Sequence, residues 1–238
     1  MIEFINSKIN LLNYNQLVFF TGAGMSAESG VPTYRGLGGI WHEYKWESYA
    51  CQNAFNNHPD GVLEFHELRR LEALKYTPHS GHEIITQIQI KRPNTVVVTQ
   101  NIDGMHQRAG TAHVVELHGS LWRLRCDAEV KVCDDLENGT YHNRKCKCGA
   151  WFRPDIVWFQ DTLNESTVHK ATKTISSCDL FISIGTSAVV WPAAGYPKLA
   201  KDSGAYCIEI NPKETELSPL YDQCIRSTAS HGLTQLFQ

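Results

Sequence analysis

The feature of this sequence that most constrains its fold is a series of short apolar runs, each followed directly by small or polar residues. The five runs are LVFF at 17–20, TVVV at 95–98, VVEL at 114–117, LFISI at 180–184 and AYCIEI at 205–210. Runs of this length that do not alternate with polar residues are typical of strands buried on both faces of a parallel sheet.

Helix signals lie between these runs. Ser80 and Glu83 form a Ser-x-x-Glu capping pattern ahead of apolar residues at helical spacing. Pro192 suits the first turn of a helix over 192–202, where its missing N–H costs nothing. Strands that alternate with helices predict an α/β protein with a doubly wound parallel sheet.

Composition excludes several other classes. The 238 residues are 42% apolar and carry a formal net charge of −3, which is ordinary for a globular protein and gives no reason to expect nucleic acid as a partner. No stretch approaches the roughly 20 apolar residues of a membrane helix. The first residues, MIEFINSKINLLNYNQ, show no secretory or transit signal, so we expect a cytoplasmic protein. The oligomeric state is left open.

The polar segments after the strands are predicted to meet. Ligands of open α/β sheets bind at the carboxyl ends of the strands. The segments concerned are 22–24, 100–103, 118, 185–187 and 211. We therefore expect them to line one crevice although they are far apart in the chain.

The first of these segments has a phosphate-binding pattern. Gly22-Ala23-Gly24-Met25-Ser26-Ala27 follows a strand and matches the G-x-G-x-x-G/A form, in which glycines let the backbone approach a pyrophosphate. A tight strand-to-helix turn without a ligand would show the same pattern. The sequence Gly30-Val31-Pro32 should end the helix after about two turns, and the stretch to Trp41 is predicted to cover a bound ligand.

Residues 122–153 break the strand–helix pattern and contain four of the eight cysteines. Structural zinc takes two cysteine pairs in tetrahedral geometry. We predict a zinc site of Cys126, Cys133, Cys146 and Cys148, although the spacings C-x6-C and C-x-C are unusual. His142 is the alternative fourth ligand, and a module held by packing without zinc is the other interpretation. The remaining cysteines, 51, 178, 207 and 224, are expected to be buried apolar residues of a reduced protein.

Six motifs in order resemble those of the sirtuins, from about residue 15 to 230. GAGMSAESGVPTYRG resembles the sirtuin cofactor loop, TQNIDGMHQRAG the second signature, and ELHGS the segment with the general-base histidine. FRPDIVWFQD resembles the substrate-binding segment, GTS the ribose and phosphate turn, and EIN the end of a late strand.

This resemblance implies an NAD-dependent protein-lysine deacylase with a Rossmann-like sheet and a structural zinc ion. It implies His118 as the general base, with Asn101 also at the reacting centre, and release of nicotinamide and O-acyl-ADP-ribose. The NAD-binding residues it implies are Gly22, Ala23, Gly24, Tyr34, Arg35, Trp41, Gln100, Asn101, Asp103, Gly185, Thr186, Ser187 and Asn211. Acyl-lysine would enter from the opposite side as an extended peptide, against Val157, Trp158 and Phe159.

The acyl preference is less clear. The bacterial CobB-like class III sirtuins read acidic acyl chains with a Tyr-x-x-Arg pair on one helix face. Here Arg69 stands at the arginine position and His66 replaces the tyrosine, while Ala50 and Thr33 match that group. A guanidinium can bind a succinyl or malonyl carboxylate in bidentate fashion, and we expect His66 to donate one further hydrogen bond. A solvated helix face is the alternative for Arg69. Mixed activity is our hypothesis.

We predict a single catalytic domain over 1–238. Its Rossmann-like half comprises about 1–40, 76–121 and 154–238, and its small module comprises about 41–75 and the zinc-binding 122–153. The alternative activity is that of an NAD glycohydrolase or mono-ADP-ribosyltransferase on the same fold. A non-enzymatic NAD-sensing module is disfavoured by the joint presence of Asn101, Asp103 and His118.

Overall fold

A computed structural model describes residues 9–33, 39–136, 138–187 and 189–237 of the chain, and all structural statements below refer to them. Tyr34 and Arg35, two of the predicted NAD-binding residues, lie outside this part. So does much of the predicted cover that leads to Trp41.

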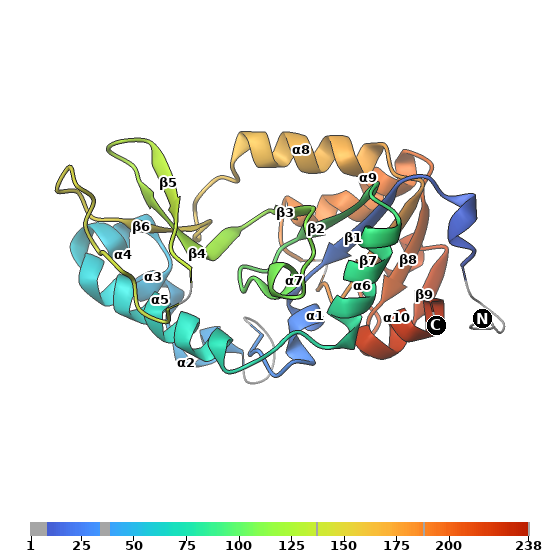
Figure 1. Cartoon of the computed structure of the whole chain (residues 1–238), viewed down its shortest axis with the longest axis horizontal. Coiled ribbons are helices and arrows are strands. Elements are labelled where there is room, and N and C mark those ends of the chain that lie inside the picture. Colours follow the sequence, from blue (N-terminus) through green and yellow to red (C-terminus); the bar gives the residue numbers. More distant parts are fainter. Residues whose placement is uncertain (1–8, 34–38, 137, 188, 238) are drawn as a thin grey trace.

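A six-stranded parallel sheet forms the larger part of the molecule (Figure 1). It contains all five predicted strands within about one residue of their expected ends, and one further short strand. The strands are β1 (Leu17–Thr21), β2 (Thr95–Thr99), β3 (Val114–Glu116), β7 (Leu180–Ile184), β8 (Tyr206–Ile210) and β9 (Gln223–Ile225). Their order across the sheet is β3-β2-β1-β7-β8-β9, and every pairing is parallel.

Both faces of this sheet are covered by helices, which explains the unbroken apolar runs. Leu17 and Phe19 face one apolar cluster, whereas Val18 and Phe20 face the other. The helices α6 (Ser80–Lys91) and α10 (Ala229–Phe237) pack on the first face, and α8 (Glu165–Ser176) and α9 (Tyr196–Asp202) pack on the second (Figure 1). The predicted doubly wound α/β sheet is thus confirmed.

The order of the strands indicates where a ligand crevice lies. The chain builds outward from β1 through β2 to β3, then returns to the other side of β1 with β7. In open α/β sheets, ligands bind at such a switch point, outside the carboxyl ends of the strands. Those loops begin here at Gly22 and Gly185.

A small module stands beyond the carboxyl ends of these strands (Figure 1). It contains an antiparallel sheet of order β5-β4-β6 and four helices. Their bounds are β4 (Gly119–Cys126), β5 (Lys131–Asp134), β6 (Arg153–Ile156), α2 (Ile40–Glu43), α3 (Trp46–Tyr49), α4 (Gln52–Asn57) and α5 (Pro59–Leu74). A separate apolar cluster, which includes Leu63, Leu124 and Trp158, forms its core.

Two predicted helix starts are wrong. Helix α6 begins at Ser80, so the capping role falls to His79, whose Nδ1 accepts the N–H of Gly81 at 3.0 Å. The predicted helix over 192–202 is a short 3-10 helix followed by α9, and the proline in the first turn of α9 is Pro197. A proline fits there because that position has no N–H partner within the helix.

The remaining elements are short. They are α1 (Ala23–Ala27), α7 (Met105–Arg108) and the 3-10 helices η1 (Leu11–Asn13), η2 (Ala193–Gly195) and η3 (Ser218–Leu220). Helix α1 is shorter than the two turns predicted, and Gly30 follows it with φ +99°. None of the described helices has both the length and the apolar character that crossing a bilayer requires.

Candidate functional site

A cavity of about 1180 Å³ lies between the strand ends and the small module. Most of the predicted site residues line it. After the strands of the parallel sheet these are Gly22, Ala23, Gly24, Gln100, Asn101, His118, Gly185, Thr186, Ser187 and Asn211; the others are Trp41, His66, Arg69, Val157, Trp158 and Phe159. The expected convergence of distant segments on one crevice is therefore observed.

The loops after β1 and β7 touch backbone to backbone. The N–H of Gly24 donates to the Gly185 carbonyl at 2.9 Å. A Cβ at Gly24 would lie 2.7 Å from the Gly185 Cα, and a Cβ at Gly185 would lie 2.5 Å from the Gly24 carbonyl carbon. Gly185 also has φ +60°, a left-handed conformation that favours glycine. Only glycine at both positions allows the two loops to meet and form one glycine floor of the cavity.

Asn101 is held tightly at the end of β2. Its Nδ2 donates to the Gly22 carbonyl at 2.9 Å and to Ser26 Oγ at 3.1 Å. Its backbone N–H donates to Thr99 Oγ1 at 3.0 Å. Because both amide protons are engaged by the cofactor loop, the amide oxygen is the group that Asn101 can offer to a ligand.

Asp103 lines a smaller adjoining cavity with Ser26, Asn101 and Arg69. Its Oδ1 accepts the N–H of Met105 at 2.9 Å. Burial raises the pKa of this carboxyl group, and the hydrogen bonds from Met105 and Ser26 partly oppose that shift. Asp103 therefore lies in the smaller cavity and not in the main one, and Asn101 lines both.

His118 is hydrogen-bonded to two of the segments that line the cavity. Its Nδ1 lies 2.9 Å from the Gln100 carbonyl, which can only accept, so this nitrogen carries the proton and Nε2 is the basic one. Its backbone carbonyl accepts the N–H of Val157 at 2.9 Å. An imidazole fixed in one tautomer by a carbonyl is suited to act as a general base.

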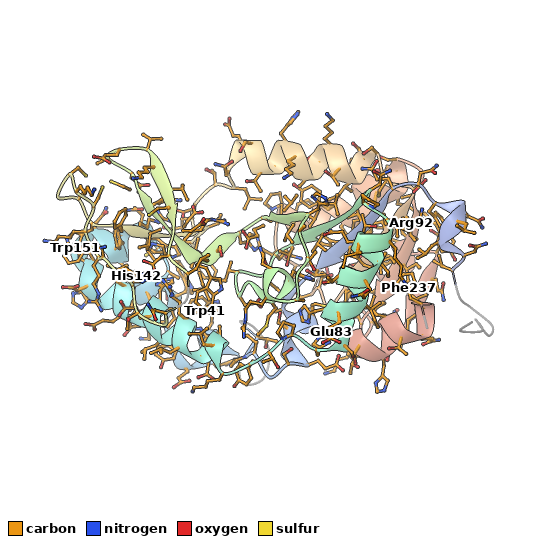
Figure 2. The ribbon with its side chains drawn as sticks, viewed as in Figure 1. Trp41, Glu83, Arg92, His142, Trp151 and Phe237 are labelled. Atoms are coloured by element: carbon orange, nitrogen blue, oxygen red, sulfur yellow. The ribbon has the colours of Figure 1, made fainter. Side chains whose placement is uncertain are left out.

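The segment 157–159 is fixed from the side that faces the module. Phe159 donates its N–H to the Ala50 carbonyl at 3.0 Å, and Trp158 donates its N–H to Asp161 Oδ2 at 3.0 Å. Trp41 packs edge-on against Phe159 with ring centroids 5.5 Å apart. These contacts give the cavity an aromatic wall at the small module, where Figure 2 labels Trp41.

His66 corrects one prediction. Its Nδ1 lies 2.8 Å from the Val62 carbonyl and must donate to it, while its Nε2 accepts the indole N–H of Trp158 at 3.2 Å. Neither nitrogen can donate to an acyl group, so the predicted hydrogen bond from His66 is wrong. Burial lowers the pKa of His66 to about 4, which keeps the ring neutral.

Arg69 differs from its neighbours in the helix. It lines both cavities. Its Nε is buried with no hydrogen-bond partner among the described residues, as are the Nε and Nη1 of Arg70. The next residue, Arg70, is fully buried and paired with Asp135 at 2.8 Å. Arg69 is thus the guanidinium that faces the cavity, and Arg70 is structural.

Several lining residues were not predicted. Ser26 anchors Asn101, and Gln160 and Trp191 contribute to the wall. Gln160 has φ +72°, which is unusual for a residue other than glycine and is found at functional sites. Ser26 and Gln160 lie within quoted motifs, but their roles arise from contacts with distant segments and no local pattern singles them out.

Three of the four clustered cysteines come together. The sulfur atoms of Cys126, Cys146 and Cys148 lie within 4.8 Å of one another, and those of Cys126 and Cys148 are 3.6 Å apart. Burial raises the pKa of Cys126, but the backbone N–H groups of Glu129 and Ala128 and the neighbouring thiols outweigh this, so its pKa is lowered. Three sulfur atoms so placed can hold one structural zinc ion.

Cys133 does not belong to this group, which corrects the predicted ligand set. It pairs with Leu124 in the β4–β5 ladder, whereas Cys126 pairs with Lys131. Its sulfur lies 3.6 Å from the Leu124 carbonyl, and its side chain packs against the core of the small module. The register of the hairpin therefore keeps the Cys133 sulfur out of the thiol cluster.

Known proteins agree with this arrangement. The Sir2 family matches residues 22–192. A relative from Aquifex aeolicus (strain VF5), named NAD-dependent protein deacylase, is 40% identical over 226 residues, which is 93% of both chains. The structure of a Sir2 homolog–NAD complex has 36% identity and a TM-score of 0.85, and covers 94% of this chain and 88% of its own.

A second solved structure holds a Sir2 protein with a deacetylated p53 peptide and 3'-O-acetyl ADP ribose. It is 28% identical, with a TM-score of 0.82, and covers 94% of this chain and 93% of its own. These matches over nearly the whole length show that the chain belongs to the Sir2 family, that of the sirtuins.

Proposed function

We propose that this protein is an NAD-dependent protein-lysine deacylase that releases nicotinamide and O-acyl-ADP-ribose. The observation that carries the proposal is the position of His118. Its ring is hydrogen-bonded to Gln100 on the cofactor side, and its carbonyl is hydrogen-bonded to Val157 on the opposite wall. A base in this position can serve a reaction between ligands bound on the two sides.

The residues of the cavity have distinct tasks in this proposal. Gly22, Ala23 and Gly24, with 185–187 and Asn211, bind the phosphates and the adenosine half of NAD. Gln100, Asn101 and Asp103 hold the nicotinamide and its ribose. An amide oxygen is a weak nucleophile, so alignment of the acyl-lysine with the ribose supplies much of the rate, up to about 7–11 kcal/mol in favourable cases. Nε2 of His118 then accepts a proton from a ribose hydroxyl.

The proposed peptide partner is an acyl-lysine segment of another protein, bound as an extended strand beside 157–159. The N–H groups of Val157 and Phe159 are already engaged, so this segment offers its carbonyl groups to the peptide backbone. We place the enzyme in the cytoplasm. The eight cysteines are all free thiols, which supports a reducing compartment.

The test is product analysis with and without an acyl-lysine peptide. Mass spectrometry should show nicotinamide release that depends on the peptide and yields O-acyl-ADP-ribose. His118→Ala should lower the rate by about 10²–10⁴-fold while NAD still binds. Nicotinamide release at the same rate without peptide would instead favour the NAD glycohydrolase, and ADP-ribose on a protein acceptor would favour the transferase.

We further propose that Arg69 reads an acidic acyl group, alongside activity on neutral ones. Its buried, unpartnered Nε at the cavity supports this, since a carboxylate would give the guanidinium a partner. His66 supplies no second donor, so of these two residues only Arg69 binds the acidic acyl group.

Arg69→Met is expected to reduce desuccinylation by roughly 10–150-fold, since a hydrogen bond to a charged group contributes about 1.5–3 kcal/mol. Deacetylation should change little. Arg69→Lys serves as the control, because it retains the charge but not the planar fork. Equal rates of desuccinylation in wild type and Arg69→Met would refute the assignment.

A further inference from the structure

The thiol cluster of the small module contains three sulfur ligands, whereas structural zinc sites hold four protein ligands. The fourth ligand must come from a donor near Cys126, Cys146 and Cys148. Cys133 is turned toward the module core, as described above. Three other side chains remain to be considered.

Two of them are engaged elsewhere. His142, labelled in Figure 2, has its Nδ1 3.3 Å from Asp135 Oδ1 and its Nε2 3.2 Å from Asn138 Nδ2. Asp127 follows Cys126 directly and is paired with Arg125 at 2.9 Å. The alternative ligand considered for the sequence, His142, is therefore part of a different polar group.

Glu129 is the third, and it lies at the cluster. Its Oε2 is 3.6 Å from the sulfur of Cys146. It stands three residues after Cys126, and its own backbone N–H is directed at the Cys126 sulfur. The resulting pattern Cys-x2-Glu has the spacing that zinc-binding pairs commonly use.

Two of the donor–donor distances match those of a tetrahedral zinc centre. Zn–S bonds of about 2.3 Å and Zn–O bonds of about 2.1 Å at the tetrahedral angle place two sulfurs about 3.8 Å apart and a sulfur and an oxygen about 3.6 Å apart. The observed Cys126–Cys148 separation is 3.6 Å and the observed Cys146–Glu129 separation is 3.6 Å. These two pairs together contain all four donors. The three sulfurs already lie within 4.8 Å of one another, and the Glu129 carboxylate has to move closer to Cys126 or Cys148 when zinc binds.

We propose that Glu129 is the fourth zinc ligand, so that the small module binds zinc through three thiolates and one carboxylate. This assignment accounts for the unusual cysteine spacing. The partner of Cys126 is Glu129 rather than Cys133, and Cys133 is a core residue. A carboxylate is a normal zinc ligand and carries the same charge as the thiolate it replaces.

The proposal is tested by metal binding and not by deacylation, so its outcome is independent of the proposed function. Purified wild-type protein should contain one zinc per chain by elemental analysis. Competition with a chromophoric chelator should show that Glu129→Gln weakens zinc binding by more than about tenfold, the lower bound for outer-shell changes. Asp134→Asn, which removes an equal charge from an exposed carboxylate of β5, should bind zinc as wild type does.

Cobalt substitution counts the thiolates directly. The wild-type sulfur-to-cobalt charge-transfer band should have the intensity of three thiolates. Glu129→Cys should keep the metal and raise that intensity by about one third, since four thiolates replace three. Cys133→Ser should leave the band unchanged. This second pair of variants decides the question even if Glu129→Gln does not fold.

Two results would overturn the proposal. If Cys133→Ser lowers the charge-transfer intensity by a quarter, Cys133 is the fourth ligand. If Glu129→Gln binds zinc with wild-type affinity and Glu129→Cys adds no charge-transfer intensity, water completes the site instead.

Discussion

The two parts of the molecule are stabilised in different ways. The Rossmann-like half packs a sheet of apolar strands between helices, and its fully buried side chains are mainly Leu, Ile, Val and Phe. In the small module, by contrast, the two largest fully buried side chains of the described chain are arginines, Arg70 and Arg153. The core of the small module contains charged side chains, and each needs a partner of opposite charge because an unpaired buried charge is costly.

Each buried arginine has a carboxylate partner and an aromatic ring over its guanidinium, although some of its nitrogens have no hydrogen-bond partner among the described residues. Arg70 pairs with Asp135 and lies between the rings of Trp122 and Tyr141, with its guanidinium carbon 5.0 Å and 4.5 Å from the ring centroids. Arg153 pairs with Asp161 and lies 3.7 Å above the ring of Trp158. Trp158 belongs to the cavity wall, so the polar core of the small module also positions the proposed substrate side.

The largest predicted loss of stability comes from removing an ion pair in the polar core of the small module. Arg70→Met should lower the free energy of unfolding by about 3–5 kcal/mol, because Asp135 is left buried without a counter-charge. Chemical denaturation measures the loss. Adding Asp135→Asn should recover part of it, and a double variant no more stable than Arg70→Met would show that the loss comes from packing alone.

The next largest effect comes from disturbing the backbone contact between Gly24 and Gly185 in the Rossmann-like half. Gly185→Ala should cost at least about 2 kcal/mol, from a left-handed conformation and from overlap with Gly24. It should also weaken NAD binding in calorimetric titration. Gly204→Ala is the matched control, since Gly204 has φ +92° but nothing within 4 Å of the added Cβ. Equal losses in the two variants would mean that the close approach contributes nothing.

The third effect concerns buried histidines, which occur in both parts. Burial lowers the pKa of His66 to about 4 in the small module, and those of His82 and His106 to about 2 and about 3 in the Rossmann-like half. The unfolded chain therefore binds more protons below pH 6.5, the ordinary histidine value, and stability must fall as the pH falls through this range.

Each of these histidines contributes at most about 1.4 kcal/mol per pH unit. Thermal unfolding measured from pH 7 to pH 5 should show the decline. His66→Gln should make the decline shallower by one such contribution, because glutamine does not titrate. An unchanged slope in this variant would mean that His66 titrates normally in the folded protein.

The smallest predicted effect concerns an exposed ion pair, in contrast to the buried pair of Arg70 and Asp135. Lys198 and Asp202 form an ion pair on α9 of the Rossmann-like half at 2.7 Å, with side chains 67% and 58% exposed. Lys198→Ala should change the free energy of unfolding by no more than about 0.5 kcal/mol, since water and salt screen the pair. A loss as large as that of Arg70→Met would contradict the link between burial and the strength of ion pairing.

The Rossmann-like half was largely predictable. Buried parallel strands require apolar residues on both faces, so their positions are visible in single runs such as LVFF. Strand β9 was missed because Gln223–Ile225 is too short and polar to show this pattern. The cofactor loop was found because the approach of two backbones requires glycine, as at Gly24.

The small module was less predictable, because its groups act through partners that are distant in sequence. The role of Cys133 depends on the register of β4 and β5, and that of His66 depends on the indole of Trp158. The family resemblance pointed to Arg69 as the arginine that faces the cavity, but no local pattern shows whether Arg70 is exposed or buried. Tertiary packing decides it by covering Arg70 with Trp122 and Tyr141.

The sequence by itself thus determined the parallel sheet, the glycine floor and the position of His118 at a strand end, since each depends on a local pattern that backbone geometry demands. Only the tertiary structure decided which nitrogen of His66 carries the proton, how Arg70 is buried and which thiols form the cluster. Those outcomes depend on distances between segments far apart in the chain, and no local pattern records such distances.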